Sequence, residues 1–201
     1  MNINDIRGYF SRTEQIEIIK LLYKYNYPEC VGVEVGCMHG RSSIVISIAI
    51  NKGILYCIDK WDGSVTHKKA YSDEFIAKHK MPGPNNVNTL ETFVKNTESQ
   101  KNIIPISGSS PEIVQDWLKP IDFIFLDASH KNPNDRDNID FWLPKIKPGG
   151  MFLGHDWVEG ANQDRGFPDV NLNVEYMEDF LKQRVTIIPN TSIWYFTLPN
   201  S

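Results

Sequence analysis

Residues 30–40 read CVGVEVGCMHG, and this stretch decides the fold. The first half is a short apolar run, which predicts a buried strand. The second half is a loop with glycines at both ends, Gly36 and Gly40. Residues 41–51 then show the apolar pattern of a helix, and Gly53 is a stop signal for it. A buried strand, a short loop and a helix are the opening of a parallel α/β sheet.

The same alternation continues on both sides of this stretch. We expect further strands at residues 54–58, 103–106, 121–126 and 151–153, and helices at residues 11–25, 89–97, 111–118, 135–143 and 174–183. Residues 147–150, Lys-Pro-Gly-Gly, predict a turn. Residues 185–188 and 192–197 predict two strands that leave no room for a crossover helix, so they should form a hairpin with one antiparallel strand. The fold class is therefore α/β, a doubly wound Rossmann-like sheet that is mostly parallel.

Length and composition predict one domain over residues 1–201, with an N-terminal helical segment at residues 1–28. The apolar share of 41% and the charged share of 23% are those of an ordinary globular chain. Residues 60–88 are polar, contain Pro82-Gly83-Pro84 and show little periodicity. They are too long for an ordinary connection, so we expect a lid or an insertion there.

Charge and cysteine usage indicate which class of partner and which cellular compartment to expect. The net charge of −4 includes no basic surplus, which favours a small-molecule partner over nucleic acid. The three cysteines show no CxxC spacing, so neither a disulfide framework nor a zinc site is expected. The N-terminus is polar and no apolar run reaches 18 residues, so we expect a cytoplasmic protein without membrane attachment. We allow for a homo-oligomer, since the sequence does not fix the oligomeric state.

The glycine loop and the acid after the second strand indicate a ligand site. The loop is neither GxGxxG nor a Walker A loop, but its glycines let a backbone pass close to a ligand. Asp59 follows the second strand, where a carboxylate can accept hydrogen bonds from ribose hydroxyls. Taken singly, the glycines also fit an ordinary turn, and Asp59 also fits a helix cap.

Five ordered motifs together resemble the class I S-adenosylmethionine-dependent methyltransferases. They are EVGCMHG, YCID, SGSSPEIV, IDFIFLDASH and KPGGMFLGHDW, spread over roughly residues 30–157. The resemblance implies a seven-stranded sheet and S-adenosylmethionine as cofactor. It also implies cofactor contacts from the glycine loop for the methionine part, from the second-strand acid for the ribose and from the third-strand loop for the adenine edge. The residues concerned are Glu34, Gly36, Gly40, Asp59, Gly108, Ser109 and Asp127, with Trp61 as an apolar wall or a packing residue.

Acidic and imidazole groups also follow the fourth and fifth strands. Asp127-Ala-Ser-His130 ends one, and Gly154-His155-Asp156 ends the other. Because these two strands are neighbours in a doubly wound sheet, their ends should lie together and offer a divalent-cation site. Oxygen-rich ligation suits Mg²⁺ or Mn²⁺. Each of these groups also has a structural alternative: Asp127 as a turn cap, His130 as a surface histidine, and His155-Asp156 as a hydrogen-bonded pair.

The pattern resembles the metal-dependent O-methyltransferases of the catechol and macrolide-sugar types. That resemblance implies Asp127, His155 and Asp156 as metal ligands, although the catechol type has an Asp at the place of His155. It implies His130 as the catalytic base beside Asp127, where the catechol type has a Lys. An imidazole suits proton removal near neutral pH.

Three functions therefore compete. The first is a metal-assisted O-methyltransferase acting on a small polyhydroxylated or aromatic acceptor. The second is a metal-independent N- or O-methyltransferase on the same fold, which uses His130 alone. The third is a non-catalytic relative that binds the cofactor. Against the third, the groups that the chemistry needs are present together: Asp127, His130 and Asp156.

Overall fold

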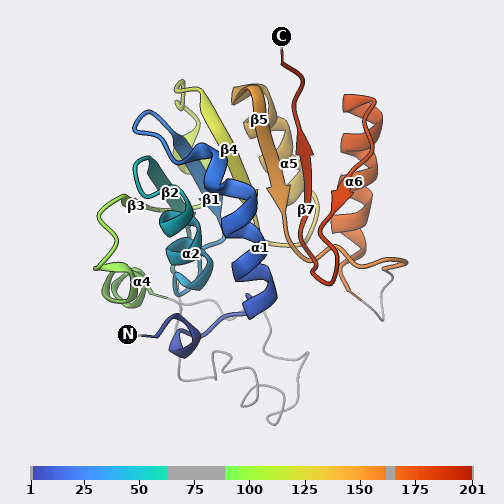
Figure 1. Cartoon of the computed structure of the whole chain (residues 1–201). Helices are drawn as coiled ribbons and strands as arrows, with labels where there is room; N and C mark the ends of the chain where they lie inside the picture. Colours follow the sequence, from blue (N-terminus) through green and yellow to red (C-terminus); the bar gives the residue numbers. More distant parts are fainter. Residues whose placement is uncertain (1, 63–88, 162–165, 201) are drawn as a thin grey trace.

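One seven-stranded sheet organises the molecule, and a computed structural model describes it for residues 2–62, 89–161 and 166–200 (Figure 1). The strand order is β3-β2-β1-β4-β5-β7-β6. The bounds are β1 Val31–Val35, β2 Ile54–Asp59, β3 Ile103–Ser107, β4 Ile121–Leu126, β5 Ile146–Gly154, β6 Thr186–Ile187 and β7 Trp194–Thr197. β1 to β5 pair in parallel, whereas β7 runs antiparallel to both β5 and β6. The predicted fold class and the C-terminal hairpin are confirmed.

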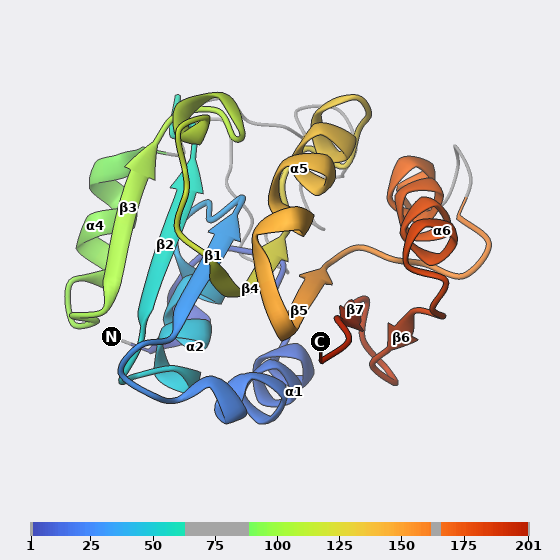
Figure 2. The same ribbon diagram turned by 90° about the horizontal axis from the view of Figure 1, so that it is seen from above.

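Helices cover both faces of the sheet, as the view from above shows (Figure 2). α1, α2 and α4 pack on one face, and α5 and α6 pack on the other. The bounds are α1 Arg12–Leu22, α2 Arg41–Ala49, α4 Leu90–Thr97, α5 Asn134–Trp142 and α6 Pro168–Leu181. Short 3-10 turns are η1 Ile3–Asp5, η2 Tyr23–Tyr25, η3 Glu112–Val114 and η4 Leu143–Lys145.

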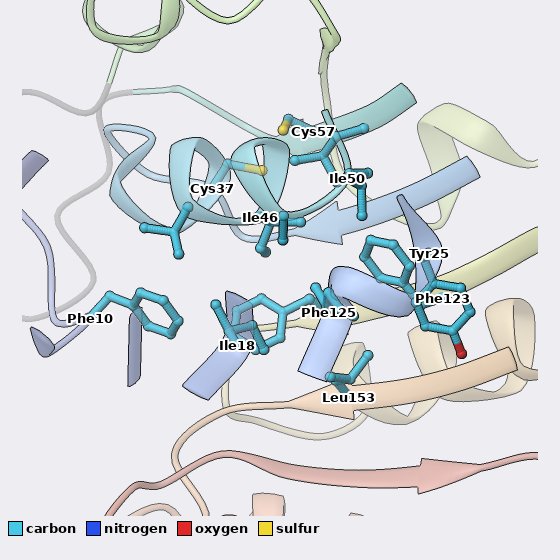
Figure 3. Packing of buried hydrophobic residues seen from close by; sticks show 14 of the residues in the cluster. Phe10, Ile18, Tyr25, Cys37, Ile46, Ile50, Cys57, Phe123, Phe125 and Leu153 are labelled. Atoms are coloured by element: carbon cyan, nitrogen blue, oxygen red, sulfur yellow. The ribbon is translucent and has the colours of Figure 1, made fainter. Parts of the chain in front are cut away.

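Two apolar layers hold these helices to the sheet because successive strand residues face opposite sides. Phe123 and Phe125 of β4 face α1 and α2, whereas Ile124 faces the other layer. On the first face, Ile18 of α1 and Ile46 of α2 are fully buried against these rings (Figure 3). The buried face of α1 therefore fixes the N-terminal segment on the sheet.

The N-terminal segment is also tied to the edge of the sheet where the parallel strands end. The guanidinium of Arg41, at the start of α2, donates to the carbonyls of Ile6 at 2.6 Å and Gly8 at 2.6 Å. A capping box starts α1: the Ser11 N–H donates to Glu14 Oε2 at 2.8 Å, and the Glu14 N–H donates to Ser11 Oγ at 3.3 Å. The capping box fixes the direction of α1 and so places Glu14 at the carboxyl edge of the sheet.

Three of the expected elements were wrong or shifted. The helix expected at residues 111–118 is only the single turn η3, because Pro120 follows closely and a proline cannot continue a helix. The turn expected at residues 147–150 lies inside β5, which pairs with β4 on both sides of a register shift. α6 begins at Pro168 rather than Val174, since a proline at the first helical position loses no hydrogen bond.

The expected lid lies mostly outside the described residues, since 63–88 are not among them. At its base, Asp62 and Thr89 form an isolated antiparallel bridge. Among the helices in the described part of the chain, none is long and apolar enough to cross a membrane.

Candidate active site

The loops that follow β1 and β4 cross in direct contact at the carboxyl edge of the sheet. Gly36 adopts a φ of 92°, and a Cβ there would lie 1.8 Å from the carbonyl oxygen of Asp127. The Asp127 N–H also donates to the carbonyl of Val35 at 2.9 Å. Only glycine fits this crossing. It places the predicted cofactor loop directly against the predicted metal ligand.

Asp59 holds the loops around it in place. Its Oδ2 accepts from the Met38 N–H at 2.8 Å, and its Oδ1 accepts from the Trp61 N–H at 3.1 Å. Gly108 is brought to the same place, because its N–H donates to the Asp59 carbonyl at 2.9 Å. The structure therefore gathers three of the predicted cofactor elements: the glycine loop, the acid after β2 and the loop after β3, where Ser109 follows Gly108.

Trp61 packs rather than standing open to solvent. Its side chain is 6% exposed, its ring lies 4.6 Å from that of Phe93, and its indole N–H donates to the Met38 carbonyl at 2.8 Å. The structure shows this packing, and the role of Trp61 as an apolar wall for the adenine stays a prediction. Through Met38, it supports the loop that ends at Gly40, the residue before α2.

Glu34 lies fully buried beneath the cofactor loop. Ser42 Oγ of α2 donates to its Oε1, and the Cys57 thiol lies 3.5 Å from its Oε2. Burial raises the pKa of Glu34 to about 7, although the hydrogen bond from Ser42 and the nearby Cys57 thiol oppose the rise. Glu34 therefore holds β1, β2 and α2 together at the point where the loop starts.

We predict that Glu34 makes the protein less stable as pH rises. The folded state keeps this proton up to about pH 7, whereas the unfolded chain releases it near 4.5, so the unfolded state gains stability between these values. The expected loss in the free energy of unfolding is about 2–3 kcal/mol between pH 5 and pH 8. Urea denaturation should show this fall in the wild type and a smaller one in Glu34→Gln. Parallel pH profiles for the two proteins would contradict it.

Asp127, His130 and Asp156 meet at the ends of β4 and β5. His130 Nε2 lies 3.0 Å from Asp127 Oδ1 and 2.9 Å from Asp156 Oδ2, so the imidazole stands between two carboxylates. One ligand atom from each of the three residues lies within 4.8 Å of the others, a spacing that a metal ion can bridge. The His130 ring stacks on Phe167 at 4.4 Å. The structure thus brings the predicted base and two predicted metal ligands together.

His155 approaches the same carboxylates from inside the protein. Its side chain is 4% exposed, and its Nδ1 lies 3.4 Å from Asp156 Oδ1 and 3.7 Å from Asp127 Oδ2. On the other side of the ring, Nε2 lies 3.0 Å from Glu14 Oε1 and 3.0 Å from Ser192 Oγ. Within the described ranges of the chain, no group forms a hydrogen bond with Nδ1.

The charges of this cluster are strongly coupled. Burial alone would lower the pKa of His130, but hydrogen bonds and charges from Asp127 and Asp156 raise it to about 10. Burial acts on His155 in the same way, and the charges of the two aspartates raise its pKa well above the usual value. Burial would raise the pKa of Asp156, but the two histidines hold it well below its usual range. The two aspartates therefore attract positive charge.

Backbone strain is concentrated at this edge. His130 has a φ of 57° and Asp156 a φ of 61°, while Met38 and Trp61 in the cofactor loops have 45° and 42°. A positive φ of this kind costs a non-glycine residue about 1–3 kcal/mol, and it persists where the surrounding structure imposes it. Such strain is typical of functional sites, so it supports placing the site here.

The sequence patterns do not point to Glu14 or Ser192. Ser11 and Glu14 have the spacing of a capping box, and that signal predicts only a helix start. The contact of Glu14 with His155 joins residues 141 positions apart, which no local pattern reveals.

Comparisons with known proteins identify the family and the fold. Residues 33–157, more than half of the chain, match a family model described as a methyltransferase domain. The chain therefore belongs to the methyltransferase family, and the resemblance to the class I S-adenosylmethionine-dependent methyltransferases is confirmed.

Solved structures share the fold at low sequence identity. The O-methyltransferase NovP matches with a TM-score of 0.62 and 17% identity over 93% of this chain and 81% of its own. The O-methyltransferase from Bacillus cereus in complex with SAH gives 0.59 and 16%, over 93% and 81%. The O-methyltransferase TomG from Streptomyces achromogenes in complex with SAM gives 0.61 and 15%, over 96% and 82%.

Proposed function

We propose that this methyltransferase transfers the methyl group of S-adenosylmethionine to a hydroxyl of a small polyhydroxylated or aromatic acceptor, assisted by Mg²⁺ or Mn²⁺. The observation that carries the proposal is the meeting of Asp127, His130, His155 and Asp156 against the glycine loop at one edge of the sheet. This arrangement places the proposed cofactor loop next to side chains that can bind a cation and accept a proton. The O-methyltransferases that share the fold support the reaction class.

The residues present fit a divalent cation. Asp127 and Asp156 supply carboxylate oxygens, and the buried His155 Nδ1 is aimed at both of them without a hydrogen-bond partner in the described part of the chain. Mg²⁺ and Mn²⁺ prefer oxygen ligands, and Mn²⁺ tolerates an imidazole. We propose these three residues as the ligands. His130 also lies within ligand distance, so it is a further candidate.

The chain's own residues then orient the acceptor and remove its proton. A bound cation would supply charge stabilisation and lower the pKa of the acceptor hydroxyl. With a cation on Asp127 and Asp156, the charges that raise the pKa of His130 would be cancelled, so the imidazole would be neutral and could take the proton as general base. The sulfonium methyl is already activated, so the remaining task is in-line alignment, which can contribute roughly 7–11 kcal/mol. The contact of Gly36 with Asp127 couples the cofactor loop to that alignment.

One observation favours a second candidate, a metal-independent N- or O-methyltransferase. His130 Nε2 already stands between Asp127 and Asp156, where an imidazolium would neutralise both carboxylates. In that case the imidazolium would orient the acceptor, and the minor neutral form of His130 would take its proton, without a cation. Turnover assayed in a chelator separates the two candidates.

We predict that Asp59→Ala weakens cofactor binding. The proposed ribose hydrogen bonds would be lost, each contributing about 0.5–3 kcal/mol. The loop would also lose the support that Asp59 gives to Met38 and Trp61. Calorimetry with S-adenosylhomocysteine measures the affinity, and Asp62→Ala serves as the control because Asp62 is exposed nearby. Equal affinity in wild type and Asp59→Ala would remove Asp59 from the cofactor site.

A further inference from the structure

Behind His155, the candidate cation site is supported by two residues that lie outside the sequence motifs, Glu14 and Ser192. His155 stands between the carboxylates of Asp127 and Asp156 on one side and Glu14 with Ser192 on the other. Glu14 is 5% exposed and belongs to α1. The N-terminal helix therefore reaches the site through one buried imidazole.

The groups around Glu14 are hydrogen-bond donors, so its carboxyl group accepts hydrogen bonds here. The Ser11 N–H donates to Oε2 at 2.8 Å, and the Ser192 N–H donates to Oε1 at 3.3 Å. Backbone N–H groups never accept, so both carboxyl oxygens of Glu14 act as acceptors here, and Oε1 also accepts from the Ser192 hydroxyl at 3.1 Å. Glu14 is therefore a carboxylate, and the 3.0 Å contact with His155 requires the proton on Nε2.

With one proton held on Nε2, the nitrogen that faces the site is Nδ1, which offers a lone pair to a cation once any proton on it is released. Nδ1 faces Asp156 Oδ1 at 3.4 Å and Asp127 Oδ2 at 3.7 Å. One imidazole nitrogen and two carboxylates therefore converge, and Nδ1 has no hydrogen-bond partner in the described part of the chain. The rings of Phe10 and Phe125 lie 5.8 Å and 6.3 Å from the imidazole and limit its movement.

We propose that Glu14 is a positioning residue, which fixes His155 in the tautomer that presents its Nδ1 lone pair to a divalent cation bound by Asp127 and Asp156. The proposal rests on the proposed metal-assisted function. A carboxylate on the far nitrogen of a ligating histidine orients the ring and makes it a better ligand. Losing such a partner lowers metal affinity by roughly 10–100-fold.

The test is the affinity for Mn²⁺ alone, measured by electron paramagnetic resonance on the full chain without acceptor. Glu14→Ala should bind Mn²⁺ roughly 10–100-fold more weakly than the wild type. Ser11→Ala is the matched control, because it removes the hydroxyl of the same capping box but leaves Glu14 on His155. It should bind Mn²⁺ as the wild type does.

Glu14→Gln provides a second variant of equal size in case Glu14→Ala does not fold. Its amide NH₂ must replace one carboxyl oxygen. There it faces another donor, either the Ser11 N–H or the protonated Nε2 of His155, so an acceptor is lost and Mn²⁺ affinity should also fall. Wild-type affinity in a folded Glu14 variant would overturn the role of Glu14 alone. Failure of the wild type to bind Mn²⁺ would instead overturn the metal-assisted function on which the proposal rests.

Discussion

His130→Ala should lower kcat by roughly 10²–10⁴-fold, as expected when a general base is lost. The imidazole lies at hydrogen-bond distance from both Asp127 and Asp156, at the site where we propose that the acceptor hydroxyl loses its proton. Raised pH should restore part of the rate, because hydroxide or an ionised acceptor replaces the base. Steady-state kinetics across a pH series measures both effects.

Phe167→Leu is the control for the His130 variant. It removes the ring stacked on the imidazole at 4.4 Å but leaves the base itself, so kcat should fall much less. Affinity for S-adenosylhomocysteine should remain close to wild type in both variants. A His130→Ala enzyme with wild-type kcat would show that the proton is removed elsewhere.

Asp156→Ala should abolish turnover while cofactor affinity stays nearly intact. The proposed cation would lose a carboxylate ligand, and His130 and His155 would lose a charge partner at 2.9 Å and 3.4 Å. The proposed cofactor loop is held by Asp59, which accepts from the Met38 N–H, and not by Asp156, so it should be unaffected. Methyl-transfer assays and calorimetry on the same preparation separate the two effects.

Asp140→Ala controls for the removal of a carboxylate in general, since Asp140 lies on the exposed side of α5 and bonds Tyr176. It should retain wild-type turnover. If Asp156→Ala lost cofactor affinity as strongly as turnover, Asp156 would belong to the cofactor site instead.

The strands and the edge where the chemistry lies were predictable because their signals are local. The strands β1, β2 and β4 are short apolar runs, and each ends at a glycine or an aspartate that sequence alone marks: Gly36, Asp59 and Asp127. The rules of parallel sheets then reduce the strand orders that are possible. The weak helix signal at residues 111–118 failed because exposed Leu118 supports no buried face and Pro120 ends the segment.

The pairing of side chains inside the site could not be predicted. The sequence favours His155 as a ligand beside the acids, but the structure also places His130 Nε2 between Asp127 and Asp156. Which nitrogen of His155 faces the site depends on Glu14, and Glu14 is positioned by the packing of α1 on the sheet. Such contacts depend on tertiary packing rather than on spacing along the chain.

Metal dependence of methyl transfer tests the central claim most directly. The purified enzyme, S-adenosylmethionine and a panel of small catechol and sugar acceptors are assayed in EDTA, and then after addition of Mg²⁺ or Mn²⁺ in excess. EDTA should abolish transfer to the accepted hydroxyl compound and either cation should restore it, because the proposed ligands Asp127, His155 and Asp156 would act through the cation. Full turnover in EDTA would contradict the metal-assisted function and favour His130 acting alone.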